Sequence, residues 1–392
     1  MRRGLAWSRT AIGSGAASLV TIVVQGSAIV LLPPPDYGLF ALFSLVLGLG
    51  TTAVYSLLSE AWSKGSSSGQ DWPSYSTMLV CISTSAAIPV LCIAVFTSSW
   101  DVVFGMIIAI PASIYRVGAR YFSIASADRS AIALPDLIAL VVLLVSVAVQ
   151  LLWLHPMLAL SCGWGLAAVA AALCSRPPRM IGGRMLGTWY REHWPHARVL
   201  VADSVLLESG SSLVPMTLTP FMGLEQFGVY RSISSAAVPV RLIINPLRPN
   251  IAGMTSGALL SARVVLLVAA MGAVSGTAVW LLLVLLRTQS YIQGSTLFAL
   301  SGYALPAALY VGVNFISTFY SLALRTHVDG PALIVNRTVV LAFAIVVPIG
   351  GFFCFGLGGA VWGYVAVTSI ALAAALLTLR RSRPRHDVSE RS

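Results

Sequence analysis

The chain has 392 residues, of which 57% are hydrophobic and 9% are charged, whereas a soluble domain carries roughly a quarter charged residues. This composition excludes a water-soluble fold. Hydrophobic runs of about 20 residues recur along the whole length, as helices that cross a bilayer require. The runs are continuous rather than alternating, so we expect an all-α integral membrane protein.

Apolar runs between polar segments predict about twelve transmembrane helices. In chain order they span residues 11–32, 37–61, 75–97, 102–125, 133–154, 157–174, 199–221, 226–250, 261–286, 293–322, 332–354 and 356–379. The longest polar connector separates the sixth helix from the seventh. The predicted organisation is an N-terminal six-helix lobe (1–175), a cytoplasmic linker with an interfacial segment (176–198), a C-terminal six-helix lobe (199–379) and a basic cytoplasmic tail (380–392).

Basic residues gather in the loops of one side of this topology. They are Arg2, Arg3, Arg9, Lys64, Arg129, five arginines of the linker and five of the tail, whereas only Arg287 stands in a loop of the other side. Because cytoplasmic loops hold the excess of positive charge, both termini are predicted to be cytoplasmic. The net charge of +11 is then a topology signal, and no nucleic-acid partner is expected.

Short motifs of the first lobe recur in the second. Tyr37-Gly38 aligns with Phe227-Gly228 at an offset of 190 residues, and PASIY from Pro111 aligns with PAALY from Pro306 at an offset of 195. Ordered matches with a slowly drifting offset indicate an internal duplication. Six helices separate the equivalents, so the halves have the same orientation, and such parallel repeats enclose a central cavity.

The eighth predicted helix carries a basic stripe. Its members are Arg231, Ser234, Val238, Arg241, Asn245 and Arg248, which on an ideal helix fall within an arc of about 100°. A buried arginine costs at least about 2.5 kcal/mol at mid-membrane, so Arg241 is predicted to face water, a carboxylate or an anionic ligand. Snorkelling to the interfaces is an alternative for Arg231 and Arg248, and an internal pair with a glutamate is one for Arg241.

Other polar side chains are weaker candidates for the cavity. Gln25 ends a polar face of the first helix, Arg116 lies toward the inner end of the fourth, and Asn314 lies in the matching part of the tenth. Snorkelling is the alternative for Arg116, and interhelical hydrogen bonding is the alternative for Asn314. Glu208 and Asp203 on the seventh helix are candidates for ion coupling, or for pairing with Arg241. Five cysteines stand singly without metal-type spacing, so no metal and no cofactor are expected.

Four segments carry a family resemblance. They are PDYGLFAL after the first helix, LEQFGVYRSISSAAVP after the seventh, the segment that ends in ADRS, and GLGGAVWGYVAV at the start of the twelfth. The chain resembles the polysaccharide-type (Wzx-like) lipid-linked oligosaccharide flippases of the multidrug/oligosaccharidyl-lipid/polysaccharide exporter superfamily. It is short for that family and lacks the two extra helices of the lipid II flippases. The predicted second helix also offers Ser44, Thr51, Tyr55 and Glu60 but no arginine, so the basic cavity is not symmetric.

This resemblance implies two six-helix bundles around a cavity lined by helices 1, 2, 7 and 8. It implies transport of a polyprenyl-pyrophosphate-linked oligosaccharide from the cytoplasmic to the outer leaflet of a bacterial inner membrane, by alternating access. The basic residues would bind the pyrophosphate, and a proton or sodium gradient would drive the cycle. The implied partners are membrane lipids, the anionic lipid-linked glycan and polysaccharide-assembly proteins.

Two other functions remain open. A drug or cation antiporter of the same superfamily would need acidic and aromatic cavity residues, for which Glu208 and Asp203 are the candidates. A non-transporting scaffold of a glycan-assembly complex would leave the intramembrane charges without a role. The short external loops argue against an enzyme.

Overall fold

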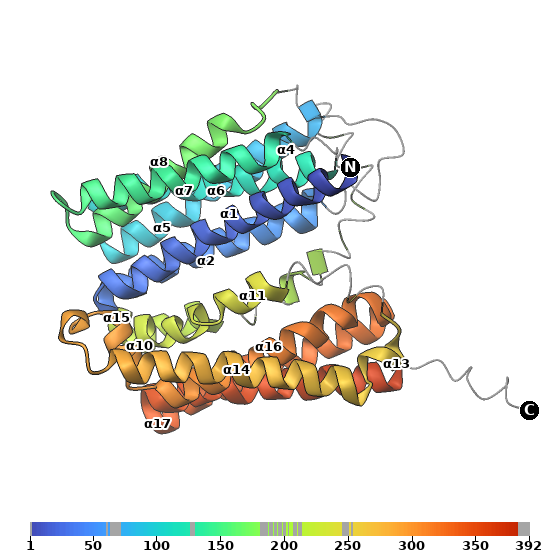
Figure 1. Cartoon of the computed structure of the whole chain (residues 1–392). Coiled ribbons are helices and arrows are strands. Elements are labelled where there is room, and N and C mark those ends of the chain that lie inside the picture. Colours follow the sequence, from blue (N-terminus) through green and yellow to red (C-terminus); the bar gives the residue numbers. More distant parts are fainter. Residues whose placement is uncertain are drawn as a thin grey trace, which may run out of the picture. The chain divides into compact units, whose positions relative to one another are not determined.

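Helices form every regular element in the part of the chain that the computed structural model describes (Figure 1). That part is residues 2–382 without 60–61, 63–71, 126–129, 181–186, 188–190, 192–193, 195–197, 199–200, 203, 207–209, 211–213, 245–250 and 252–253. The chain forms two compact units, Met1–Leu32 with Leu39–Glu208, and Pro33–Gly38 with Ser209–Ser392. The linker and tail limits at residues 175, 198 and 379 stay predictions.

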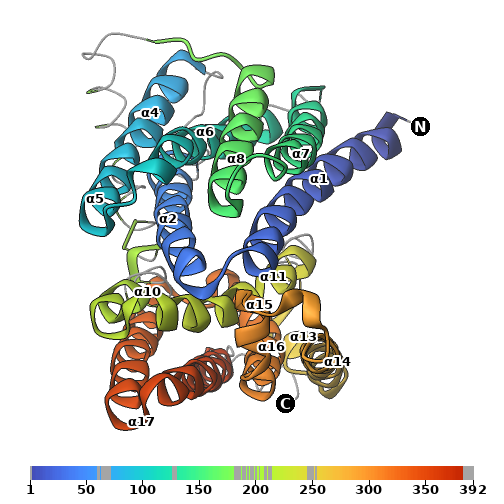
Figure 2. The same cartoon turned by 90° about the vertical axis from the view of Figure 1, so that its left-hand side faces the viewer.

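The first unit contains the helices from α1 to α8, except that the first residues of α2, up to Gly38, belong to the second unit. The bounds are α1 Arg2–Leu31, α2 Pro34–Ala53 with the π-helical turn η1 Val54–Ser59, α4 Trp72–Ser85, α5 Ala87–Thr97, α6 Trp100–Ala125, α7 Ser130–Gln150 and α8 Pro156–Cys174. Helix α8 packs against both α6 and α7 (Figure 2). A Cβ on Gly165 would lie 3.2 Å from the Gly105 carbonyl oxygen, so small residues allow α6 and α8 to pack closely.

The second unit contains the helices from α10 to α17. The bounds are α10 Val214–Ser235, α11 Val238–Ile244, α13 Ser256–Leu259, α14 Ala262–Leu286, η4 Ser290–Ile292, α15 Thr296–Ser301, α16 Ala304–His327 and α17 Gly330–Arg381. Helix α16 packs against α14 and α17. A Cβ on Gly276 would lie 2.7 Å from the Ala308 carbonyl oxygen, and one on Gly312 would lie 2.9 Å from that of Gly272, so α14 and α16 depend on these glycines.

Eight described helices are long and apolar enough to cross a membrane. One of them, α17, has 52 residues and is broken at Phe355 and Gly356, where φ of the glycine is 61°. Only glycine adopts such a conformation readily. The break lies at the predicted boundary between the eleventh and twelfth helices, which confirms two spans there. The chain is therefore an all-α, multi-pass membrane protein.

The predicted helix 226–250 is wrong as one continuous element. Helix α10 includes the end of the predicted seventh helix, passes through a non-helical Gly223 (φ 70°) and ends at Ser235. Ala236 and Ala237 form a turn before α11 begins. Pro239 lies in the first turn of α11, where its missing N–H is tolerated, and this explains why the chain bends there.

The two repeat motifs meet inside the second unit. A Cβ on Gly38 would overlap the Leu224 carbonyl oxygen, and a Cβ on Gly228 would overlap that of Pro34. Each residue of one contact lies 190 positions from its equivalent in the other, so the contact is symmetric. This reciprocity supports the internal duplication, and it explains why both motifs carry glycine.

The start of the predicted linker is bonded to the first unit. The Tyr115 hydroxyl donates to the Arg176 carbonyl oxygen at 2.7 Å, and the Trp72 indole N–H donates to that of Pro177 at 2.9 Å. The Arg176 guanidinium lies 5.9 Å from the centre of the Trp72 ring, within reach of a cation–π interaction. The Ser76 hydroxyl on α4 donates to the Arg179 carbonyl oxygen at 2.9 Å and accepts from the Arg179 N–H at 3.1 Å. Residues 176–179 are thus an ordered strap.

Candidate functional site

Arg231 lies among tyrosines of the second unit. It is partly buried on α10 and interacts electrostatically with the phenols of Tyr37 and Tyr230. Both phenol side chains are fully buried. The Tyr37 hydroxyl donates to the Ser235 Oγ at 2.7 Å, and the Tyr230 ring stacks on that of Tyr364 with 4.3 Å between centroids. The guanidinium of an arginine presents hydrogen-bond donors of the kind that bind phosphate oxygens.

The remainder of the basic stripe is only partly described. The backbone of Arg241 lies in α11, whereas Asn245 and Arg248 lie outside the described residues. A turn separates α10 from α11. The arc of about 100°, which assumes one ideal helix, therefore does not apply to Arg231 and Arg241 together. The assignment of these residues to substrate binding stays a prediction.

The ion-coupling candidates, Glu208 and Asp203, also lie outside the described residues. Their pairing with Arg241, and their role in coupling, stay predictions. Asn314 lies on α16 and is partly buried. Its role as a cavity residue is likewise untested.

Gln25 contacts the second helix within the first unit. Its Nε2 donates to the Ser44 Oγ on α2 at 3.3 Å, and both side chains are partly buried. Ser44, Gly48, Thr51 and Tyr55 advance by three or four residues and lie on one side of α2 and η1. Sequence analysis noted this polar face for its lack of arginine, and the structure now adds Gln25 to it.

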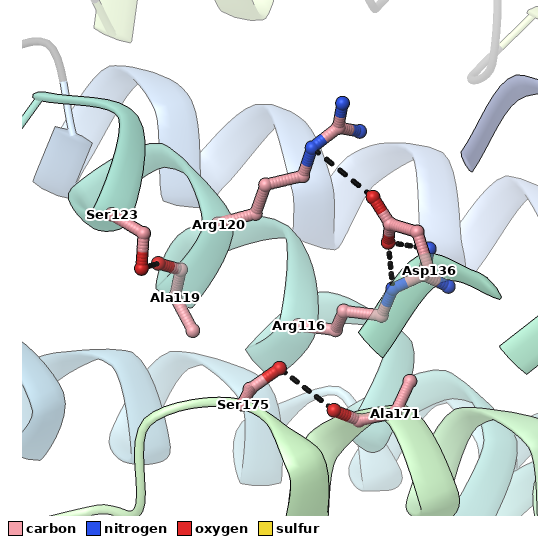
Figure 3. A network of polar contacts seen from close by, with 7 residues as sticks. All are labelled: Arg116, Ala119, Arg120, Ser123, Asp136, Ala171 and Ser175. Atoms are coloured by element: carbon pink, nitrogen blue, oxygen red, sulfur yellow. Dashed lines mark hydrogen bonds and ion pairs between the residues drawn. The ribbon is translucent and has the colours of Figure 1, made fainter. Parts of the chain in front are cut away.

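Arg116 forms an ion pair inside the first unit (Figure 3). Its Nε donates to the Asp136 Oδ1 at 2.8 Å, and the Arg120 Nε lies 3.5 Å from the other carboxylate oxygen. The Asp136 side chain is 2% exposed, whereas those of Arg116 and Arg120 are 13% and 23% exposed. A buried carboxylate between two guanidinium groups joins α6 to α7 and leaves one net positive charge.

Sequence analysis overlooked Asp136. An acid inside the apolar run 133–154 was the available signal, because it lies one predicted helix away from two arginines. The nearby bonds of Ser123 to the Ala119 carbonyl and of Ser175 to the Ala171 carbonyl, also in Figure 3, are local contacts to the residue four positions earlier.

The second unit has its own polar link between the corresponding helices. Arg337 on α17 is 6% exposed, and its Nη1 donates to the Ser321 Oγ on α16 at 2.9 Å. The adjacent Asn336 donates to the Thr378 Oγ1 at 3.1 Å. Sequence analysis overlooked both residues. In each unit an arginine therefore bonds across this pair of helices, although the helix that carries it differs.

Metal ligation has no candidate within the described residues, where no group of three or more His, Cys, Asp or Glu side chains comes together.

Comparison with known proteins identifies the fold. No family model and no curated protein matches the chain. Among solved structures, an inward-facing MATE family multidrug resistance transporter of the MOP superfamily matches with a TM-score of 0.56 and 13% identity, over 93% of this chain and 94% of that one. A eukaryotic MATE transporter matches with a TM-score of 0.55 and 14% identity, over 98% and 99%.

The lipid II flippase MurJ in an inward closed conformation matches with a TM-score of 0.57 and 12% identity, over 96% of this chain and 87% of that one. The chain thus has the fold that MATE transporters and this flippase share. About twelve helices is the number that this fold accommodates, as the sequence predicts. At 12–14% identity the likeness concerns the fold, and the substrate must be argued from the residues.

Proposed function

We propose that the chain is a membrane transporter that moves a polyprenyl-pyrophosphate-linked oligosaccharide from the cytoplasmic to the outer leaflet by alternating access. The observation that carries the proposal is Arg231, a partly buried arginine of the predicted eighth helix, which lies one helical turn before Ser235, the partner of the Tyr37 hydroxyl. An arginine inside the membrane is costly unless it serves a partner or a ligand. Its planar guanidinium suits the two phosphates of the carrier.

The described acidic groups favour an anionic substrate. Asp136 is the one buried acidic side chain among the described residues, and it is engaged by Arg116 and Arg120. A site for organic cations would have to use another acid, and Glu208 and Asp203 are the predicted candidates. In this proposal the protein is not an enzyme, resides in the inner membrane of a bacterium with both termini in the cytoplasm, and acts with the assembly proteins of a surface polysaccharide.

A drug or cation antiporter is the second candidate, because two of the matching folds belong to MATE transporters, one of them named for multidrug resistance. Its coupling ion would be bound by Glu208 or Asp203. The two candidates differ in the charge of the substrate, which makes them separable by one reconstitution.

The test uses the purified full chain in phospholipid vesicles. One set of vesicles holds a fluorescent polyprenyl-pyrophosphate trisaccharide, and its exposure in the outer leaflet is followed with a membrane-impermeant quencher. A second set holds ethidium, with an imposed proton or sodium gradient. The proposal expects exchange of the lipid well above that of protein-free vesicles, and no transport of ethidium. Transport of ethidium without lipid exchange would establish the antiporter instead, and transport of neither would favour the scaffold.

A further inference from the structure

The π-helical turn η1 changes the surface of the second helix. It spans Val54–Ser59 directly after α2, and the side chains of Val54, Ser56, Leu58 and Ser59 are buried. Tyr55, in the same turn, is 42% exposed. π-Helical turns are rare, widen the helix locally, and often occur at functional sites. In this chain the turn presents one exposed aromatic ring among four buried side chains.

A second tyrosine completes an aromatic pair. The ring of Tyr121 on α6 lies 6.2 Å from that of Tyr55, with an angle of 63° between the planes. Edge-to-face geometry of this kind stabilises both rings and leaves ring surface of Tyr55 open. The pair lies within the first unit, so two different helices fix it.

The neighbours of this pair on α2 are polar and uncharged. Thr51 precedes Tyr55 by four residues, and its hydroxyl donates to the Gly48 carbonyl oxygen at 2.9 Å. Further along the same face, Ser44 accepts the amide of Gln25. Phe104 on α6 is 71% exposed, and Ile107 and Ile108 lie one turn from it, so this ring suits lipid tails. The hydroxyls of this face can exchange further hydrogen bonds with a ligand, because a serine or threonine oxygen accepts as well as donates.

We propose that Tyr55 and Tyr121, with Thr51 one turn away and with Ser44 and Gln25 about three turns along the same face of α2, form a binding surface for the neutral sugar residues of the transported lipid. One face of a sugar ring carries C–H groups that pack on an aromatic ring, while its hydroxyls exchange hydrogen bonds with serine, threonine and glutamine. The inference rests on the proposed function and deepens it. In this inference the uncharged face of α2 serves the glycan, which explains why this helix has no arginine.

The experiment measures the two parts of the substrate separately. The full chain is placed in lipid nanodiscs, and binding of a neutral trisaccharide of N-acetylglucosamine is followed by saturation-transfer NMR. Binding of inorganic pyrophosphate is followed by phosphorus NMR. The variants are Tyr55→Ala, Tyr121→Ala and Tyr55→Phe, with Phe104→Ala as the matched control for loss of an exposed ring. Circular dichroism and the elution volume confirm that each variant is folded.

The expected result is a loss of about tenfold in saturation transfer to the trisaccharide for Tyr55→Ala and Tyr121→Ala. Tyr55→Phe and Phe104→Ala should stay within about twofold of the wild type, because the essential ring remains. Pyrophosphate binding should be equal in all four variants. Tyr121→Ala keeps the test decisive if Tyr55→Ala fails to fold.

Two results overturn the inference: wild-type protein that gives no saturation transfer to the sugar, or Tyr55→Ala and Tyr121→Ala variants that give the same transfer as wild type. Sugar binding that depends on the tyrosines, without any pyrophosphate binding, would instead support the sugar surface and contradict the pyrophosphate part of the proposed function. The two failures are thereby distinguished.

Discussion

Removal of the Asp136 carboxylate should destabilise the first unit strongly. The substitution Asp136→Ala deletes the one acidic group between Arg116 and Arg120, which are four residues apart on α6. Two guanidinium groups then remain close together without their counter-ion. Like charges at this spacing on a helix repel each other, and the more buried guanidinium loses its hydrogen-bond acceptor.

The geometry sets the size of the effect. Breaking a buried ion pair by removal of one partner typically costs 3–5 kcal/mol, and the 2.8 Å bond with a carboxylate that is 2% exposed belongs to that class. Arg116 is 13% exposed, so water can partly solvate it after the substitution, and we expect about 3 kcal/mol. Arg120→Ala should cost about 1 kcal/mol or less, because its Nε lies 3.5 Å from the carboxylate and its side chain is 23% exposed.

The assay is reversible unfolding in mixed micelles, with dodecyl sulfate as the denaturant and circular dichroism as the signal. Arg116→Ala and the double variant complete a mutant cycle, and Asp101→Ala, an exposed acid in the first turn of α6, is the matched control. We expect Asp101→Ala to stay within about 0.5 kcal/mol of wild type. An Asp136→Ala variant equally close to wild type, or a coupling energy near zero between Arg116 and Asp136, would show that the ion pair does not join α6 to α7.

Two further predictions concern packing and the strap. Gly38→Ala should lower stability by about 2 kcal/mol, because its new methyl group overlaps the Leu224 carbonyl, whereas Gly26→Ala, with no atom within 4 Å of a Cβ, should be neutral or slightly stabilising in the same unfolding assay. Equal effects of the two glycine substitutions would contradict the close contact. Trp72→Phe should raise the rate of tryptic cleavage after Arg179 by about fivefold, because it removes a hydrogen bond worth about 1 kcal/mol from the strap. Mass spectrometry measures that rate, with the exposed Trp100→Phe as control, and an unchanged rate would mean that the indole does not hold residues 176–179.

Local signals predicted most of the helical fold. The apolar runs were sufficient for the spans because a helix must be about 20 residues long and apolar to cross hydrocarbon. The break between the eleventh and twelfth helices was predictable because Gly356 stands between two such runs. The continuous helix 226–250 failed because Pro239 and the alanines before it allow either a bend or a full interruption, and packing decides between them.

The candidate site was less predictable. Arg231 was predicted because it is a basic residue in an apolar segment. The hydrogen bond between Tyr37 and Ser235 was not predictable, because the two residues are 198 positions apart and no local pattern encodes it. Asp136 was visible as an acid in an apolar run, yet its pairing with Arg116 depends on how α6 faces α7. The π-helical turn at Tyr55 is a tertiary effect, because its sequence differs little from that of an ordinary helix.

The most direct test of the proposed function measures the rate at which a polyprenyl-pyrophosphate glycan changes leaflets in vesicles. It compares wild type, Arg231→Ala and the exposed loop variant Arg287→Ala, and asks whether Arg231 recognises the pyrophosphate. We expect Arg231→Ala to slow exchange at least about tenfold, as loss of a charge-assisted bond of 1.5–3 kcal/mol implies, and Arg287→Ala to match wild type. Equal rates for wild type and folded Arg231→Ala protein would contradict the assignment of the pyrophosphate to this residue.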